Sequence, residues 1–98
     1  MEAYLTKWVP PRGHSLPTST EREGSLMKQH GAWQAGLLRQ GFILTHGPVL
    51  ARRGNCRVAI WQVEDDADIA ALTAQDPIVR AGIGHYEHFP MLQAKACS

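Results

Sequence analysis

A histidine and an aspartate carry the strongest chemical signal in this sequence. His30 falls on the apolar stripe of a predicted helix, between Leu26 and Trp33. Asp76 stands in the stretch QDPIVRAG, directly before Pro77. An imidazole can take or give a proton near neutral pH, and a nearby carboxylate can orient it. The two residues are therefore candidates for acid-base catalysis, in which His30 moves the proton and Asp76 orients the ring.

Each of these residues also has a structural explanation. A histidine on an apolar stripe is usually a core residue that a backbone carbonyl satisfies. Asp76 before Pro77 is a standard start for a helical turn, with Asp at the N-cap and Pro at the first position. Both roles of Asp76 are compatible, because one carboxylate oxygen can cap the turn while the other faces a histidine. A catalytic role requires the two side chains to meet beside an open cavity. A sealed, fully packed His30 would rule out the enzyme hypothesis, and an open pocket with the two groups apart would favour a binding module.

Four further residues are candidates for the lining of a pocket. Tyr4, Trp8 and Tyr86 can supply apolar walls, although most aromatic side chains of a small domain lie in its core or at an interface. We expect His46 on a loop beside Gly47 and Pro48, at the mouth of a pocket. The small-molecule ligand that such a pocket would take is not specified by these residues.

The sequence predicts no metal and no cofactor. His85 and His88 stand three apart in a predicted strand, so their side chains point to opposite faces and cannot share one ion. No Cys-x-x-Cys or His-Glu-x-x-His pattern, no glycine-rich phosphate loop and no nucleophile elbow is present. Cys56 has no evident activating neighbour.

Composition predicts one small cytosolic domain. The 98 residues fit a single domain, with a core at about 3–89 and a tail at 90–98. The net charge of +1 shows no Lys/Arg surplus for nucleic acid or for an acidic membrane surface. Two distant cysteines form no disulfide framework, which favours a reducing cytosol. The N-terminal stretch has no signal-peptide core, and no apolar run is long enough to span a membrane.

The hydrophobic pattern predicts the elements that must position these side chains. The expected order is a strand at 3–9, a helix at 20–40, strands at 42–45 and 57–63, a helix at 67–75, a turn at 77–81 and a strand at 83–89. Thr20 and Glu23 fit a capping box, and Gly41 is placed to end the first helix. Asp65 or Asp66 is expected to cap the second helix, and Pro90 to close the last strand.

This order is that of the α+β ferredoxin-like βαββαβ fold, with two helices on one face of a four-stranded antiparallel sheet. The strand at 57–63 is apolar on both faces: Val58 and Ile60 lie on one, and Ala59, Trp61 and Val63 on the other. A strand of this kind should be covered on both sides. We therefore expect a homodimer in which a second copy covers the open sheet face.

The chain resembles the YciI-related (YCII) family. The resemblance rests on His30, Gly41, the Gly47-Pro48 step, the Asp76-Pro77 step with Arg80-Ala81-Gly82, and an aromatic last strand with Tyr86. It implies a dimeric α+β barrel in which His30 and Asp76 face a shared cleft as a catalytic pair. At least one relative is a dehydrochlorinase acting on a chlorinated hydroquinone. This sequence departs from the usual pattern at Gly31 and in the loop at 10–19.

The leading hypothesis is a small cofactor-free enzyme that uses His/Asp acid-base chemistry for an elimination or isomerisation of a small metabolite. A non-catalytic ligand-binding or accessory module on the same dimeric scaffold is the alternative. A cofactor-free oxygenase of the related barrel type rests on fold analogy alone.

Overall fold

The computed structural model describes residues 1–11, 21–50 and 54–95. Its elements confirm the predicted α+β class, with the second helical region divided in two. In chain order they are β1 (Glu2–Val9), α1 (Glu21–Gln40), β2 (Ile43–Val49), β3 (Cys56–Val63), α2 (Ile69–Thr73), α3 (Pro77–Arg80) and β4 (His85–Met91).

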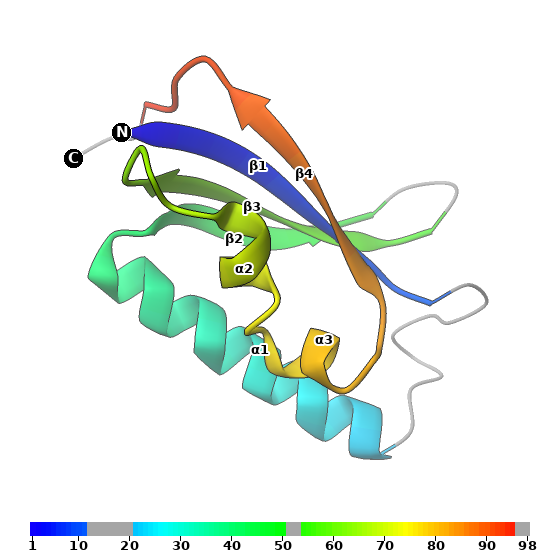
Figure 1. Ribbon diagram of the computed structural model, residues 1–98. Helices are drawn as coiled ribbons and strands as arrows, with labels where there is room; N and C mark the ends of the chain where they lie inside the picture. Colours follow the sequence, from blue (N-terminus) through cyan, green and yellow to red (C-terminus); the bar gives the residue numbers. More distant parts are fainter. Residues whose placement is uncertain (12–20, 51–53, 96–98) are drawn as a thin grey trace.

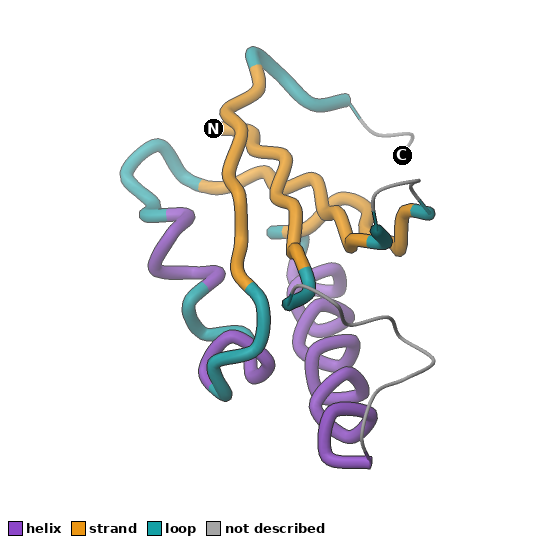
Figure 2. The backbone as a smooth tube through the Cα atoms, turned by 90° about the vertical axis from the view of Figure 1, so that its right-hand side faces the viewer, coloured by secondary structure: helices purple, strands orange, loops and turns teal. Residues whose placement is uncertain are grey.

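One antiparallel sheet carries all four strands, in the order β2-β3-β1-β4. The three helices lie on the same side of this sheet, with the long helix α1 running beneath the strands (Figures 1 and 2). The order β2-β3-β1-β4 is that of the ferredoxin-like fold. The site described below lies in the layer between the sheet and the helices.

The core forms where β3 meets α1 and α2. Trp61 is fully buried, and its ring lies 6.0 Å from that of Trp33 on α1. The indole Nε1 of Trp61 donates a hydrogen bond of 2.8 Å to the hydroxyl of Thr6 on β1, so the buried N–H is satisfied. Apolar side chains at alternate positions of β3 thus face the helices.

The C-terminal end of α1 follows its sequence signal. Gly41 has a φ of 85°, a left-handed conformation that glycine adopts without a Cβ penalty. The amides of Gly41 and Phe42 donate to the carbonyls of Leu38 and Leu37, which closes the last turn. At the other end of α1, the predicted capping residue Thr20 lies outside the described residues.

Both edge strands run through a proline, and the predicted boundaries there were wrong. Strand β2 continues through Pro48 to Val49, and β4 continues through Pro90 to Met91. Proline has no N–H for a ladder, but the outer side of an edge strand needs no donor. As a consequence His46 lies inside β2 and not on a loop.

The second helical region also differs from the prediction. Helix α2 covers only Ile69–Thr73, and its N-cap is Asp68 instead of Asp65 or Asp66. A carboxylate oxygen of Asp68 accepts a hydrogen bond of 3.2 Å from the amide of Ala71. Asp65, Asp66 and Asp68 can each cap a helix, so the local sequence does not decide which of them is the N-cap.

The sheet face away from the helices bears no helix, and it carries an apolar row beside the Lys7–Glu87 ion pair. Leu5, Ile60 and Phe89 are register partners across β3, β1 and β4 and share this face, and Phe89 is 46% exposed. A cavity of about 360 Å³ lies on the same face, against the C-terminal segment; its lining is Leu44, Thr45, Ile60, Met91, Gln93, Ala94 and Lys95. Among the described residues, no helix is long and apolar enough to cross a membrane.

Candidate functional site

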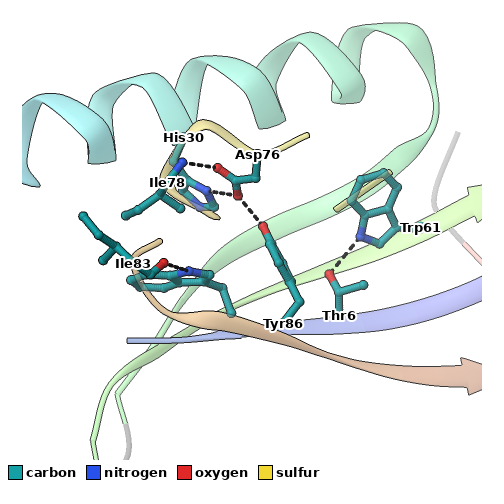
Figure 3. A network of polar contacts seen from close by, with 8 residues as sticks. Thr6, His30, Trp61, Asp76, Ile78, Ile83 and Tyr86 are labelled. Carbon is teal, nitrogen blue, oxygen red and sulfur yellow. Dashed lines mark hydrogen bonds and ion pairs between the residues drawn. The ribbon is translucent and has the colours of Figure 1, made fainter. Parts of the chain in front are cut away.

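The structure brings His30 and Asp76 together. His30 Nδ1 lies 2.5 Å from Asp76 Oδ2, and both side chains are completely buried. His30 projects from the middle of α1 toward the turn that precedes α3, where Asp76 stands (Figure 3). Two residues that are 46 positions apart in the chain thus form one buried hydrogen-bonded pair.

Asp76 caps α3 and orients His30 at the same time. Its Oδ1 accepts a hydrogen bond of 3.1 Å from the amide of Ile78, as expected for an N-cap followed by Pro77. Its Oδ2 faces His30 and also accepts a hydrogen bond of 2.6 Å from the hydroxyl of Tyr86 on β4 (Figure 3). The Asp76 carboxylate is therefore held by hydrogen bonds from α1, α3 and β4.

This network determines which nitrogen of His30 carries the proton. Because Asp76 Oδ2 accepts, His30 Nδ1 donates, and the neutral ring keeps its lone pair on Nε2. Nε2 is buried and has no hydrogen-bond partner among the described residues. An unsatisfied buried polar atom costs about 1–3 kcal/mol, so it needs an explanation beyond packing.

Tyr86 is held neutral by its surroundings. Burial, followed by the hydrogen bond to the Asp76 carboxylate, raises the pKa of Tyr86 above its ordinary value of 10.0. The phenol is therefore protonated near neutral pH and donates its hydrogen bond to Asp76. Tyr86 appeared in the sequence analysis only as a pocket wall, and its hydrogen bond to Asp76 was not predicted.

Trp8 lies beside this network on the sheet. It is the register partner of Tyr86 on β4 and of Arg57 on β3, so these three side chains form a row across the sheet on the face toward the helices. The Trp8 ring lies 6.0 Å from the ring of His30, and its Nε1 donates a hydrogen bond of 3.3 Å to the carbonyl of Ile83. Trp8 thus lies beside the His30–Asp76 pair, and its role as a pocket wall stays a prediction.

The other two candidate pocket residues occupy different positions. His46 lies on the same sheet face, in the neighbouring row with Ala59 and Thr6. Burial lowers the pKa of His46 from 6.5, and the nearby His30 and Arg57 lower it further. Tyr4 packs against the core cluster around Ile43 and Trp61 and not beside the His30–Asp76 pair.

Arg57 was missed as a site residue. Its Nε is buried and has no partner among the described residues. Because side chains alternate along a strand, Arg57 lies on the same face of β3 as Ala59, Trp61 and Val63. A charged residue on this inward face is the pattern by which the sequence could have indicated Arg57. A charged residue near the start of a strand is usually solvated, so this pattern alone does not indicate a site residue.

The second requirement for catalysis, an open cavity, is not met by the described residues. The described cavity lies on the opposite face of the sheet and includes none of the candidate site residues. His30 is 0% exposed, so a ligand can reach Nε2 only when neighbouring side chains move. Within the described ranges, no group of three His, Cys, Asp or Glu side chains is arranged to hold a metal ion.

Comparisons with known proteins agree on family and fold. A model of the YCII-related domain family matches residues 9–95. Among solved structures, the chain is similar to a point mutant of SnoaB from Streptomyces nogalater, described as a cofactor-independent oxygenase, with 18% identity and a TM-score of 0.50. The alignment covers 97% of this chain and 94% of that chain, and at this identity it shows the fold alone. No curated protein matches the sequence.

Proposed function

This chain belongs to the YCII-related domain family, and from that premise we propose that it is a small enzyme without a cofactor that uses His30 and Asp76 for acid-base chemistry. Its reaction is an elimination or an isomerisation that begins with the removal of a proton from carbon. Its substrate is a small metabolite. Trp8 and Tyr86 contact the substrate from the sheet.

The main support for this proposal is that Nε2 of His30 is buried and has no hydrogen-bond partner in the part of the chain that the structure describes. With Nδ1–H bonded to Asp76, Nε2 presents the lone pair that accepts the substrate proton. The resulting imidazolium is stabilised by the adjacent carboxylate, which Ile78 and Tyr86 hold in place. In an isomerisation the same nitrogen returns the proton to another atom of the substrate. In an elimination the C–H electron pair forms the new double bond, and the leaving group departs with the electrons of its own bond to carbon.

The complete burial of His30 means that this mechanism requires a conformational change. Since the ring is fully buried, substrate binding must displace side chains that cover it. A site that closes around its substrate excludes water and strengthens the electrostatic interactions within it. The proposal therefore includes a conformational step before chemistry.

Proton exchange tests the proposal without knowledge of the substrate. In deuterium oxide, the protein is incubated with a panel of small lactones, cyclic diketones and substituted hydroquinones, and deuterium incorporation into C–H positions is followed by NMR. We expect the wild type to exchange at least one compound. His30→Gln should abolish the exchange, and Asp76→Asn should slow it about 10²- to 10⁴-fold. His85→Gln, at an exposed position of β4, is the matched control and should exchange like the wild type.

Exchange that survives in His30→Gln would overturn the assignment of the base. A panel without exchange in the wild type would instead favour the second candidate, a non-catalytic ligand-binding module. The complete burial of His30 is the observation in favour of that candidate, because a buried His–Asp pair can serve stability alone. In that case both variants lower the free energy of unfolding and leave ligand affinity unchanged.

The proposed assembly is a homodimer through the open sheet face, in the cytosol. It is supported by the apolar row of Leu5, Ile60 and Phe89 on that face. An oxygenase activity, as described for SnoaB, has only the shared fold in its favour.

A further inference from the structure

Arg57 lies in the same layer as the His30–Asp76 pair and has no role in the mechanism above. We propose that Arg57 binds the anionic oxygen of the substrate, so that the ligand class of this site is small organic anions, carboxylates or phenolates. This inference rests on the proposed function for the reaction, but its binding step can be tested independently.

The register of the sheet places Arg57 at the site. Arg57 on β3 is paired with Trp8 on β1, and Trp8 is paired with Tyr86 on β4. Paired residues project from the same face of a sheet, and neighbouring strands lie about 4.8 Å apart. Trp8 and Tyr86 demonstrably face the helices, since one lies beside the ring of His30 and the other donates to Asp76. Arg57 therefore projects into that layer as well.

The guanidinium lacks a counter-ion among the described residues. Its Nε is buried without an acceptor, and none of the ion pairs in the described ranges includes Arg57. The nearby carboxylate of Asp76 is already engaged by His30, Tyr86 and Ile78. A guanidinium donates charge-assisted hydrogen bonds to anions, so an anion that enters the layer would supply the missing acceptor.

The two orphan atoms of this layer are complementary. Within residues 1–11, 21–50 and 54–95, His30 Nε2 is an acceptor without a donor, and Arg57 Nε is a donor without an acceptor. A small acid with a C–H bond next to its anionic group or carbonyl satisfies both. When Nε2 takes the proton, the C–H electron pair moves onto the substrate oxygen, and the N–H groups of Arg57 stabilise the added charge.

Binding of simple aromatic probes tests the charge preference. Dissociation constants are measured by NMR titration for benzoate and neutral benzamide, and for 4-nitrophenolate and neutral 4-nitroanisole. We expect the wild type to bind at least one anion about tenfold more tightly than its neutral partner, the effect of one charge-assisted hydrogen bond. The benzoate pair and the nitrophenolate pair together distinguish a carboxylate site from a phenolate site.

Substitutions at position 57 connect the preference to this residue. Arg57→Met should remove the preference while affinity for the neutral probes stays the same. Arg57 is only partly buried, and methionine keeps an unbranched side chain of similar length at this position of β3, so this variant is expected to fold. Arg57→Lys should restore part of the preference, because it keeps the charge without the planar fork. Lys7→Met, the same kind of change on the other face of β1, should bind like the wild type.

Two outcomes would overturn the proposal: an anion preference that persists in Arg57→Met, or a wild type that shows no preference in either pair. His30→Gln separates this inference from the proposed function. If the binding proposal holds and the catalytic one fails, His30→Gln retains both the anion preference and any proton exchange. If the reverse is true, proton exchange depends on His30 while the charge of the ligand has no effect on affinity.

Discussion

Asp76 shows how one carboxylate can serve a turn and a site together. The Asp-Pro step alone explains why a helical turn begins at this point. The second oxygen is free for other partners because capping uses only Oδ1. It lies between His30 and Tyr86, so the cap also fixes the orientation of the imidazole. At the scale of the residue, stability and chemistry thus depend on the same side chain.

Removal of the Tyr86 hydroxyl should weaken this network. Tyr86→Phe takes one donor from Asp76 Oδ2 and leaves the ring in place. A hydrogen bond to a charged group contributes about 1.5–3 kcal/mol, so the free energy of unfolding should fall by an amount in this range. Urea denaturation measures the difference. Tyr4→Phe is the control, since Tyr4 lies at the core cluster; an equal loss in both variants would contradict the special role of Tyr86.

His46 should cause the free energy of unfolding to fall as the pH is lowered below neutrality. Because burial and the nearby His30 and Arg57 lower its pKa below 6.5, the unfolded chain binds a proton at a higher pH than the folded chain does. The stabilisation from neutral His46 is therefore complete above the unfolded value and is lost as the pH falls through the lower, folded value. Denaturation at several pH values between about 7.5 and about 5 should show a smaller loss in His46→Gln than in the wild type. Identical pH profiles would contradict the prediction.

The elements explain which parts of the fold the sequence could predict. Strand β3 is a continuous run rich in β-branched and aromatic residues, and helix α1 carries an apolar stripe that ends at Gly41; both were predicted almost to the residue. The ends of β2 and β4 were misjudged, because Pro48 and Pro90 end a strand only when both of its sides are paired. Whether a strand lies at an edge is a property of the whole sheet and cannot be read from its own residues.

A glycine just before β4 should be essential for the position of Trp8. Gly84 has a φ of 71°, and a Cβ there would lie 2.5 Å from the carbonyl oxygen of Val9 and 2.7 Å from the Trp8 ring. Gly82 has a similar φ of 79° but nothing within 4 Å of its Cβ position. Gly82→Ala should therefore cost only the left-handed penalty of about 1–2 kcal/mol.

Gly84→Ala should cost about 1–3 kcal/mol more than Gly82→Ala, because overpacking forces the backbone and the indole apart. Thermal and urea denaturation measure the two costs, and near-ultraviolet circular dichroism reports the environment of the tryptophans. Equal destabilisation by the two substitutions, with unchanged tryptophan spectra, would show that β1 and β4 can separate locally without strain.

At the scale of the whole molecule, the site is made by elements that are distant in sequence. The candidate site takes His30 from α1, Asp76 from the start of α3 and Tyr86 from β4, and the proposed anion-binding residue Arg57 comes from β3. The sequence could nominate the first two, since each stands in a local pattern. It could not join Tyr86 and Arg57 to them, because that requires the register of three strands across the sheet.

The open sheet face leads to the last prediction, a homodimer. Phe89 is 46% exposed there, beside Leu5 and Ile60, while the opposite face of the sheet is covered by helices. An apolar face of this kind is stabilised when a second copy covers it. Light scattering after size-exclusion chromatography should give a dimeric mass for the wild type. Phe89→Glu should shift the mass toward the monomer, because a charge would be buried without a partner.

Leu38→Glu is the matched control for this substitution. Leu38 lies on α1 and is 42% exposed, so it loses a similar apolar area but is far from the open face. It should remain dimeric. For a dimer, the thermal midpoint of the wild type should also rise with protein concentration, and that of Phe89→Glu should not. A wild-type protein that is monomeric at all concentrations would mean that the apolar row of β1, β3 and β4 is stable in contact with water.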